Sequence, residues 1–139
     1  MKNLIVVPSY WTLPDHNTHQ QFDHPTPIKK EGTLSRFLKS ARKQGIENEI
    51  VVLISPLDAK VERKVKGIVA DFPDLDVHVF SRKDLKKILG MLRTCKVSTE
   101  FMRCVKLSQR FLSEINTGDY GSIRNMGLIL ALIKKADNL

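Results

Sequence analysis

Short apolar runs alternate along the chain with amphipathic stretches. Residues 4–7, 50–54 and 77–80 are short runs rich in β-branched residues, typical of strands buried on both faces of a parallel sheet. Between them, apolar residues recur with helical spacing over residues 34–45 and 61–72. A strand–helix–strand–helix–strand order predicts right-handed crossovers, and therefore a parallel sheet.

Three more helices are expected after the third strand. Ser81 with Asp84 three residues later forms a variant of the capping box, which predicts a helix start at this point. A second helix is predicted over residues 101–115. Ser122 is expected to cap the last helix, which is nearly apolar over residues 126–133 and should be buried.

Length and composition favour one soluble globular domain over residues 1–139, with 42% hydrophobic and 27% charged residues. The predicted fold class is α/β, a three-layer α/β/α arrangement on a Rossmann-like parallel sheet. Residues 9–32 are polar and rich in His, Pro, Asp and Gln. They are too many for an ordinary connection, so we expect a long functional or mobile loop.

The formal net charge of +8 favours an anionic partner, such as a nucleic acid, a nucleotide or an anionic membrane surface. The basic residues are spread over several helices without a long basic block, which favours ordinary solvated helix faces. Cys95 and Cys104 form no CxxC pair, so free thiols are expected. The chain has no apolar run near the ~20 residues of a membrane span and no signal-peptide pattern, so we expect a cytoplasmic protein.

In parallel sheets, ligands bind beyond the carboxyl ends of the strands. Two predicted strands end in segments with candidate binding residues. Tyr10 and Trp11 offer flat surfaces for a base or a sugar, although aromatic residues at a strand end also cover the edge of a core, and both interpretations stay open. The candidate residues of the two strand ends are Pro8, Ser9, Tyr10, Trp11, Ser55 and Asp58.

Arg124 and Asn125 fall in the expected first turn of the last helix. A helix dipole disfavours a cation there, so a phosphate-binding role is one explanation. A surface ion pair between Arg124 and Asp119 is the other. A metal site in the polar loop is not expected, because the spacing of its His and Asp residues matches no defined site; these residues are Asp15, His16, His19, Asp23 and His24.

Three segments carry a family resemblance: residues 4–11 (LIVVPSYW), residues 23–36 (DHPTP followed by EGTLSR) and residues 120–128 (YGSIRNMGL). Together they resemble the nucleotide-binding half of family-2-type glycosyltransferases of the GT-A fold, over essentially the whole chain. The resemblance implies a nucleotide-sugar ligand. It implies that Pro8, Ser9, Tyr10 and Trp11 line the nucleotide pocket, that the end of strand two, here Ser55 and Asp58, contributes to base binding, and that Arg124 and Asn125 lie beside the nucleotide-sugar.

Two departures from the family pattern limit what the resemblance implies. Residues 55–58 lack the adjacent aspartates usual after strand two, and no Asp-x-Asp motif lies at the end of a further strand, so no metal ligand is named. Mg²⁺ or Mn²⁺ is expected for a complete family member. We therefore expect a fragment or truncated relative that binds the donor without the full catalytic machinery.

Two further expectations concern partners. The family's sheet places another strand beside strand one, so ending at Leu139 would leave the edge of residues 4–7 exposed, which predicts a homodimer through that edge or poor solubility. The alternative function is a non-enzymatic basic α/β module that binds nucleic acid or a protein. Under the leading hypothesis we expect no nucleic-acid partner.

Overall fold

The computed structural model describes residues 3–13, 26–94 and 120–135. In chain order, the elements are β1 (Leu4–Thr12), β2 (Thr26–Pro27), α1 (Gly32–Lys43), β3 (Glu49–Ser55), α2 (Ala59–Ala70), β4 (Val77–Phe80), α3 (Arg82–Thr94) and α5 (Tyr120–Ile133). The expected helix over residues 101–115 and the His and Asp residues of the polar loop lie outside the described residues.

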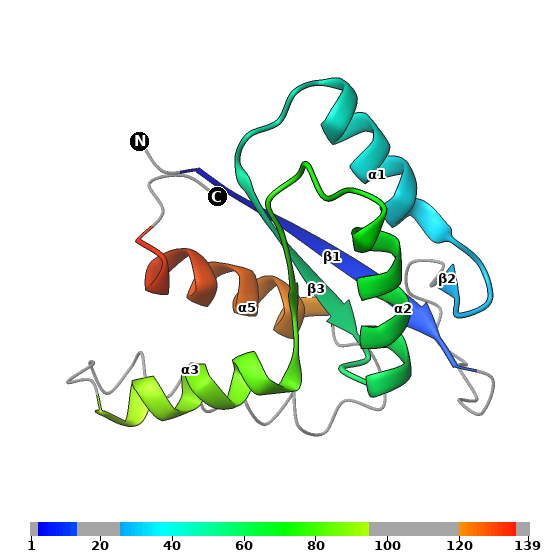
Figure 1. Cartoon of the computed structure of the whole chain (residues 1–139). Helices are drawn as coiled ribbons and strands as arrows, with labels where there is room; N and C mark the ends of the chain where they lie inside the picture. Colours follow the sequence, from blue (N-terminus) through cyan, green and yellow to red (C-terminus); the bar gives the residue numbers. More distant parts are fainter. Residues whose placement is uncertain (1–2, 14–25, 95–119, 136–139) are drawn as a thin grey trace.

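The described strands form one parallel sheet in the order β2-β1-β3-β4. Helices α1 and α2 contact each other over one face, while α5 contacts β1 and β3 from the other face (Figure 1). A pocket lined by Phe80, Ile88 and Leu130 shows that α3 lies beside α5. The α/β class, with its Rossmann-like parallel sheet between two helical layers, is thus confirmed.

The core is formed where the two faces of the sheet meet the helices. Strand β3 is the most deeply buried strand, as expected for a strand with a neighbour on each side and helices on both faces. Its apolar residues pack against the buried apolar faces of α1 and α2. The helical spacing of apolar residues in the sequence predicted these two faces. The side chains that are almost completely buried are Phe80, Leu4, Leu38, Ile50, Val51, Val52, Val61 and Val65.

Strand β1 is longer than the sequence predicts. It continues through Pro8 to Thr12, so the expected strand end and the expected loop over residues 9–32 are both wrong at this point. The Thr12 carbonyl accepts a hydrogen bond from the Ile28 N–H on the β2 side. Backbone groups of successive residues point to opposite sides of a strand, so the nitrogen of Pro8, four residues before Thr12, also faces the β2 side. Proline has no N–H to donate, but at this position the hydrogen bonds between β1 and β3 lose no donor.

A second correction to the expected loop concerns β2, which pairs with Trp11 and Thr12 at the end of β1. The Lys30 N–H then donates to the Pro27 carbonyl in a turn that leads directly into α1. The segment after Pro27 is therefore a short ordered connection. Along the edge of β1 that faces β2, the described strands cover only Trp11 and Thr12, and homodimerisation through this edge stays a prediction.

Helix α5 begins at Tyr120, so the expected cap at Ser122 is wrong, since Ser122 lies inside the first turn. The helix approaches the sheet closely at Gly127, where a Cβ atom would lie 3.2 Å from Cγ1 of Val6. After its last turn, Nζ of Lys134 lies 2.5 Å from Oε1 of Glu49, the first residue of β3. Helix α5 therefore runs antiparallel to the strands and begins at their carboxyl ends (Figure 1).

An arginine joins the end of α1 to the segment that follows α2. The guanidinium of Arg42 donates to both carboxylate oxygens of Asp74 and to the Asp71 carbonyl. It also lies 4.6 Å from the centre of the Phe72 ring. The hydrogen bond from Arg42 holds the pKa of Asp74 below its usual value.

In the described part of the chain, no helix is long and apolar enough to cross a membrane.

Candidate functional site at the carboxyl edge of the sheet

The carboxyl ends of β1, β3 and β4 lie at one edge of the sheet because the strands are parallel. In the register, Tyr10 is opposite Ser55, so the predicted residues of two separate segments are neighbours. Helices α2, α3 and α5 all begin at this edge. A helix start presents backbone N–H groups without intrahelical partners and a partial positive charge, which attract an anion wherever no carboxylate already caps the helix.

The pleat divides the predicted residues between the two faces of the sheet. Val6 and Leu53 face α5, since both lie within 4 Å of a Cβ placed on Gly127. Side chains alternate along a strand, so Tyr10, four residues after Val6, and Ser55, two after Leu53, face the same layer. Tyr10 and Ser55 thus lie at the sheet edge, on the face where α5 begins.

Ser9 and Trp11 face the opposite layer and are joined to each other. The indole Nε1–H of Trp11 donates to Oγ of Ser9 at 2.8 Å, and both side chains are buried. Only 4% of Trp11 is exposed, so its ring packs in the core and offers little surface to a ligand. Of the two interpretations left open for this aromatic pair, the structure gives Trp11 the packing role. Pro8 lies before this pair and is exposed.

Asp58 and Arg82 make hydrogen bonds in the loops that follow β3 and β4. Asp58 is the N-cap of α2, and its carboxylate accepts a hydrogen bond from the Lys60 N–H at 2.7 Å. Nε of Arg82 donates to the Leu57 carbonyl at 2.6 Å, which ties the two loops together. Sequence reasoning missed Arg82, although its position directly after a strand and Ser81 was the available signal.

Arg124 and Asn125 belong to α5, but to its second turn. The expectation of the first turn is wrong, because the helix begins at Tyr120. The N–H groups without intrahelical partners are therefore those of residues 120–123, a turn with no acidic residue. The side chains of Arg124 and Asn125 lie outside the described atoms, and their roles stay predictions.

The start of α3 carries the clearest electrostatic arrangement at this edge. Asp84 accepts hydrogen bonds from the Ser81 N–H at 2.8 Å and the Ser81 hydroxyl at 2.6 Å, which confirms the predicted capping box. Nε2 of His78 lies 3.3 Å from the same carboxylate. Burial raises the pKa of Asp84, but the bonds from Ser81 and the proximity of His78 outweigh it, so the pKa is lowered overall.

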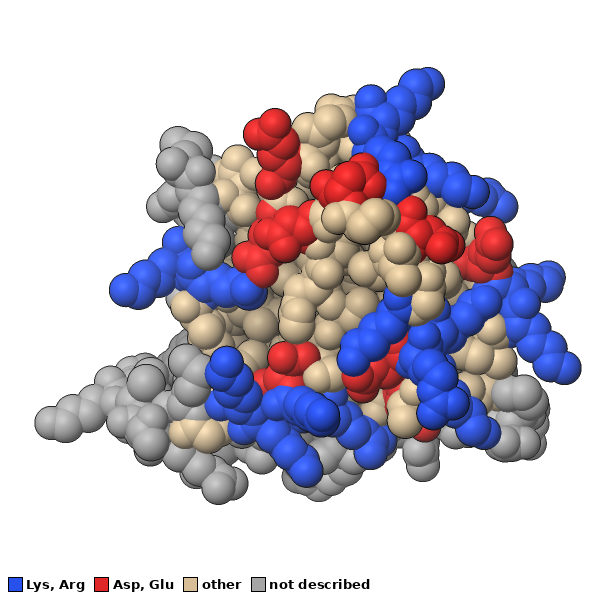
Figure 2. Space-filling model, in the orientation of Figure 1, with Lys and Arg blue, Asp and Glu red and all other residues tan. Residues whose placement is uncertain are grey.

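Basic residues elsewhere form no single patch on the visible face. Figure 2 shows Lys and Arg side chains interspersed with Asp and Glu over this surface. Among the described residues, no group of three or more His, Cys, Asp and Glu side chains is gathered as a metal site.

Comparison with known proteins found no matching family model, no matching curated protein and no matching solved structure.

Proposed function

We propose that this chain is a glycosyltransferase-like domain that binds a nucleotide-diphosphate sugar at the carboxyl edge of its sheet. The observation that carries the proposal is the meeting of three segments at that edge. Tyr10 and Ser55 are opposite each other in the register, and α5, which contains Arg124 and Asn125, begins on the face that they share. These segments, distant in the sequence, include two of the three that carry the family resemblance.

Each part of this edge suits a different part of the ligand. The half-buried ring of Tyr10 is a surface against which a base or sugar can stack. Ser55, at the end of β3, is only 3% exposed, so its hydroxyl can exchange hydrogen bonds with a ribose or a base only if the neighbouring side chains move. The first-turn N–H groups of α5 and the Arg124 guanidinium can bind the diphosphate. The Mg²⁺ or Mn²⁺ implied by the resemblance stays a prediction.

Calorimetric titration of UDP, GDP and their sugars into the purified chain tests the proposal. We expect saturable binding, and we expect Arg124→Ala to weaken it by roughly 1.5–3 kcal/mol, about ten- to a hundredfold in Kd, because a charge-assisted contact to phosphate is lost. Lys43→Ala is the matched control. It also removes one positive charge, but from the last turn of α1, far from the carboxyl edge.

The outcome that counts against the proposal is equally specific. If Arg124→Ala and Lys43→Ala bind the nucleotide-sugar equally well, the assignment of Arg124 is wrong. If no nucleotide binds, while an unspecific oligonucleotide binds with steep salt dependence, the chain is the basic nucleic-acid module that was the alternative.

A further inference from the structure

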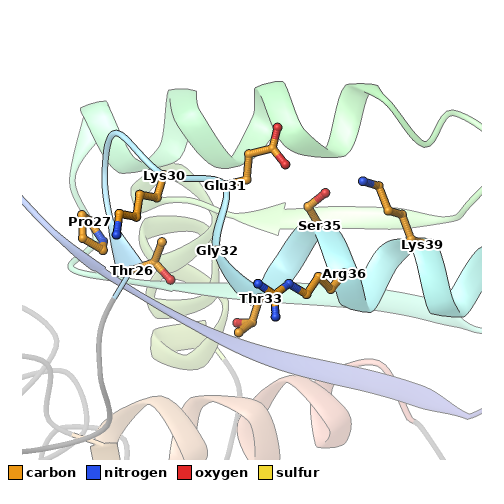
Figure 3. A pocket seen from close by; sticks show the side chains of 9 residues that line it. All are labelled: Thr26, Pro27, Lys30, Glu31, Gly32, Thr33, Ser35, Arg36 and Lys39. Carbon is orange, nitrogen blue, oxygen red and sulfur yellow. The ribbon is translucent and has the colours of Figure 1, made fainter.

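A second pocket lies at the start of α1, on a part of the molecule that the nucleotide-sugar proposal does not use. Its volume is about 510 Å³, within the range of small-molecule sites. Residues 26–36, which include much of the second segment of the family resemblance, surround it (Figure 3). The lining residues are Thr26, Pro27, Lys30, Glu31, Gly32, Thr33, Ser35, Arg36 and Lys39.

The charge of this lining favours an anion. Lys30, Arg36 and Lys39 bring three positive charges and Glu31 one negative charge. Within the described ranges of the chain, none of the three cations is held in an ion pair. An anion in the pocket would be attracted by each of these cations, more strongly the nearer it lies. A phosphate monoester, which carries nearly two negative charges at neutral pH, matches the balance of the lining.

Helix α1 adds backbone donors to the pocket. Glu31 occupies the N-cap position in a helical conformation and makes no side-chain cap hydrogen bond. The first turn contains no acidic residue that would balance the helix dipole. The first N–H groups of this twelve-residue helix thus have no capping side chain, and they border the same pocket as the three cations.

Ser35 is an independent indication of a ligand. It lines the pocket one turn into α1, yet only 8% of it is exposed. No described residue hydrogen-bonds its side chain. The hydroxyl oxygen itself is not fully enclosed, so it keeps access to the pocket and can donate to a ligand there. A bound oxyanion would accept this hydroxyl's hydrogen bond.

The pocket also has a fixed shape where β2 meets α1. Gly32 has φ of +69°, and a Cβ at this position would lie 2.6 Å from Oγ1 of Thr26. Only glycine allows this close approach, and the turn closed by the Lys30 N–H and the Pro27 carbonyl holds the connection together. The donors at the start of α1 are therefore positioned before a ligand arrives.

We propose that this pocket binds the phosphate group of a phosphorylated small molecule, through the first-turn N–H groups of α1, the Ser35 hydroxyl, Arg36 and Lys39. The inference does not rest on the nucleotide-sugar proposal. The pocket lies beside α1, whereas Tyr10 and Ser55 face the layer of α5 on the other side of the sheet.

Amide NMR with inorganic phosphate tests the site directly. The largest shifts are expected at residues 32–34, and Arg36→Gln should weaken phosphate binding about tenfold because a charge-assisted bond is lost. Lys43→Gln is the control, since it removes the same charge from an exposed position of the same helix outside the pocket. Lys43→Gln should change the affinity for phosphate less than about twofold.

Two further titrations identify the source of the phosphate. A hexose phosphate and UDP are compared with inorganic phosphate, and the ligand that shifts the same amides at the lowest concentration identifies the class. The proposal is overturned if phosphate at millimolar concentration leaves these amides unchanged, or if Arg36→Gln and Lys43→Gln lose affinity equally. Because Arg124→Ala reports only on the α5 side, failure here is distinguishable from failure of the nucleotide-sugar proposal.

Discussion

Replacing Gly32 with alanine should destabilise the protein through two separable effects. Gly32 has φ of +69°, a backbone conformation that L-residues rarely adopt. The added Cβ would also lie 2.6 Å from Oγ1 and 2.7 Å from Cγ2 of Thr26. The first effect is conformational strain, and the second is a steric clash with the neighbouring segment at β2.

A second glycine allows the two effects to be measured apart. Gly45 has φ of +64°, but a Cβ there would meet nothing within 4 Å. Left-handed backbone costs an L-residue about 1–2 kcal/mol, partly offset by about 0.4–1 kcal/mol because alanine restricts the unfolded chain. Gly45→Ala should therefore cost about 1 kcal/mol. Gly32→Ala adds an overpacking cost of about 1–3 kcal/mol and should lose about 3 kcal/mol in total.

Urea unfolding followed by the fluorescence of Trp11, the single tryptophan, gives the free energy of unfolding for each variant. The decisive variant combines Gly32→Ala with Thr26→Ala, which removes the two closest clashing atoms and leaves Cβ of Thr26 at 3.1 Å. In the Thr26→Ala background, Gly32→Ala should cost about as much as Gly45→Ala. Equal losses for Gly32→Ala and Gly45→Ala in the wild-type background would refute the close contact.

Two other predictions concern Trp11 and Asp84. Trp11→Ala should lower the free energy of unfolding by about 3–5 kcal/mol, since it empties a buried site; a midpoint of urea unfolding by circular dichroism equal to that of the wild type would contradict the burial. Asp84→Ala should cost about 1 kcal/mol at neutral pH through loss of the cap on α3. The folded-state pKa of Asp84 is lowered, so its stabilising effect is present above the ordinary pKa of 3.8 and disappears as the pH falls through the folded-state pKa. The wild type and Asp84→Ala should therefore have the same free energy of unfolding at low pH. A difference in stability that does not depend on pH would show that the carboxylate is not responsible.

The features predicted correctly from the sequence were those set by local pattern. The apolar periodicities of α1 and α2 and the capping box of Ser81 and Asp84 depend on residues within a few positions of one another. The order of strands and helices then determined the parallel sheet. For the same reason, the sequence alone predicts which edge of the sheet holds the carboxyl ends of the strands.

The errors arose where the outcome depended on a distant neighbour. Pro8 was interpreted as the end of β1, because the sequence does not tell that its nitrogen faces the edge away from β3. Strand β2 is two residues long, too short to produce a periodic pattern. Trp11 was placed beyond the strand, although it is buried in the core with Ser9 as its hydrogen-bond partner.

The pocket at the start of α1 was also missed. Lys30 lies before α1, whereas Arg36 and Lys39 lie three positions apart within the helix, and the glycine that brings β2 against α1 has no signature apart from its position. The missing side-chain cap at Glu31 could have been a signal, because the residues before α1 include no Ser, Asp or Asn at the capping position.

The central claim is that a nucleotide-sugar binds at the carboxyl edge of the sheet, on the face of α5. Amide NMR during titration with UDP-sugars and GDP-sugars tests it most directly. The account predicts saturable shifts in residues 10–13, in residues 55–58 and at the start of α5, with little change at Leu4, Glu49 and Val77, which begin their strands at the opposite edge. Shifts centred on that opposite edge, or no saturable shift with any nucleotide-sugar, would contradict it.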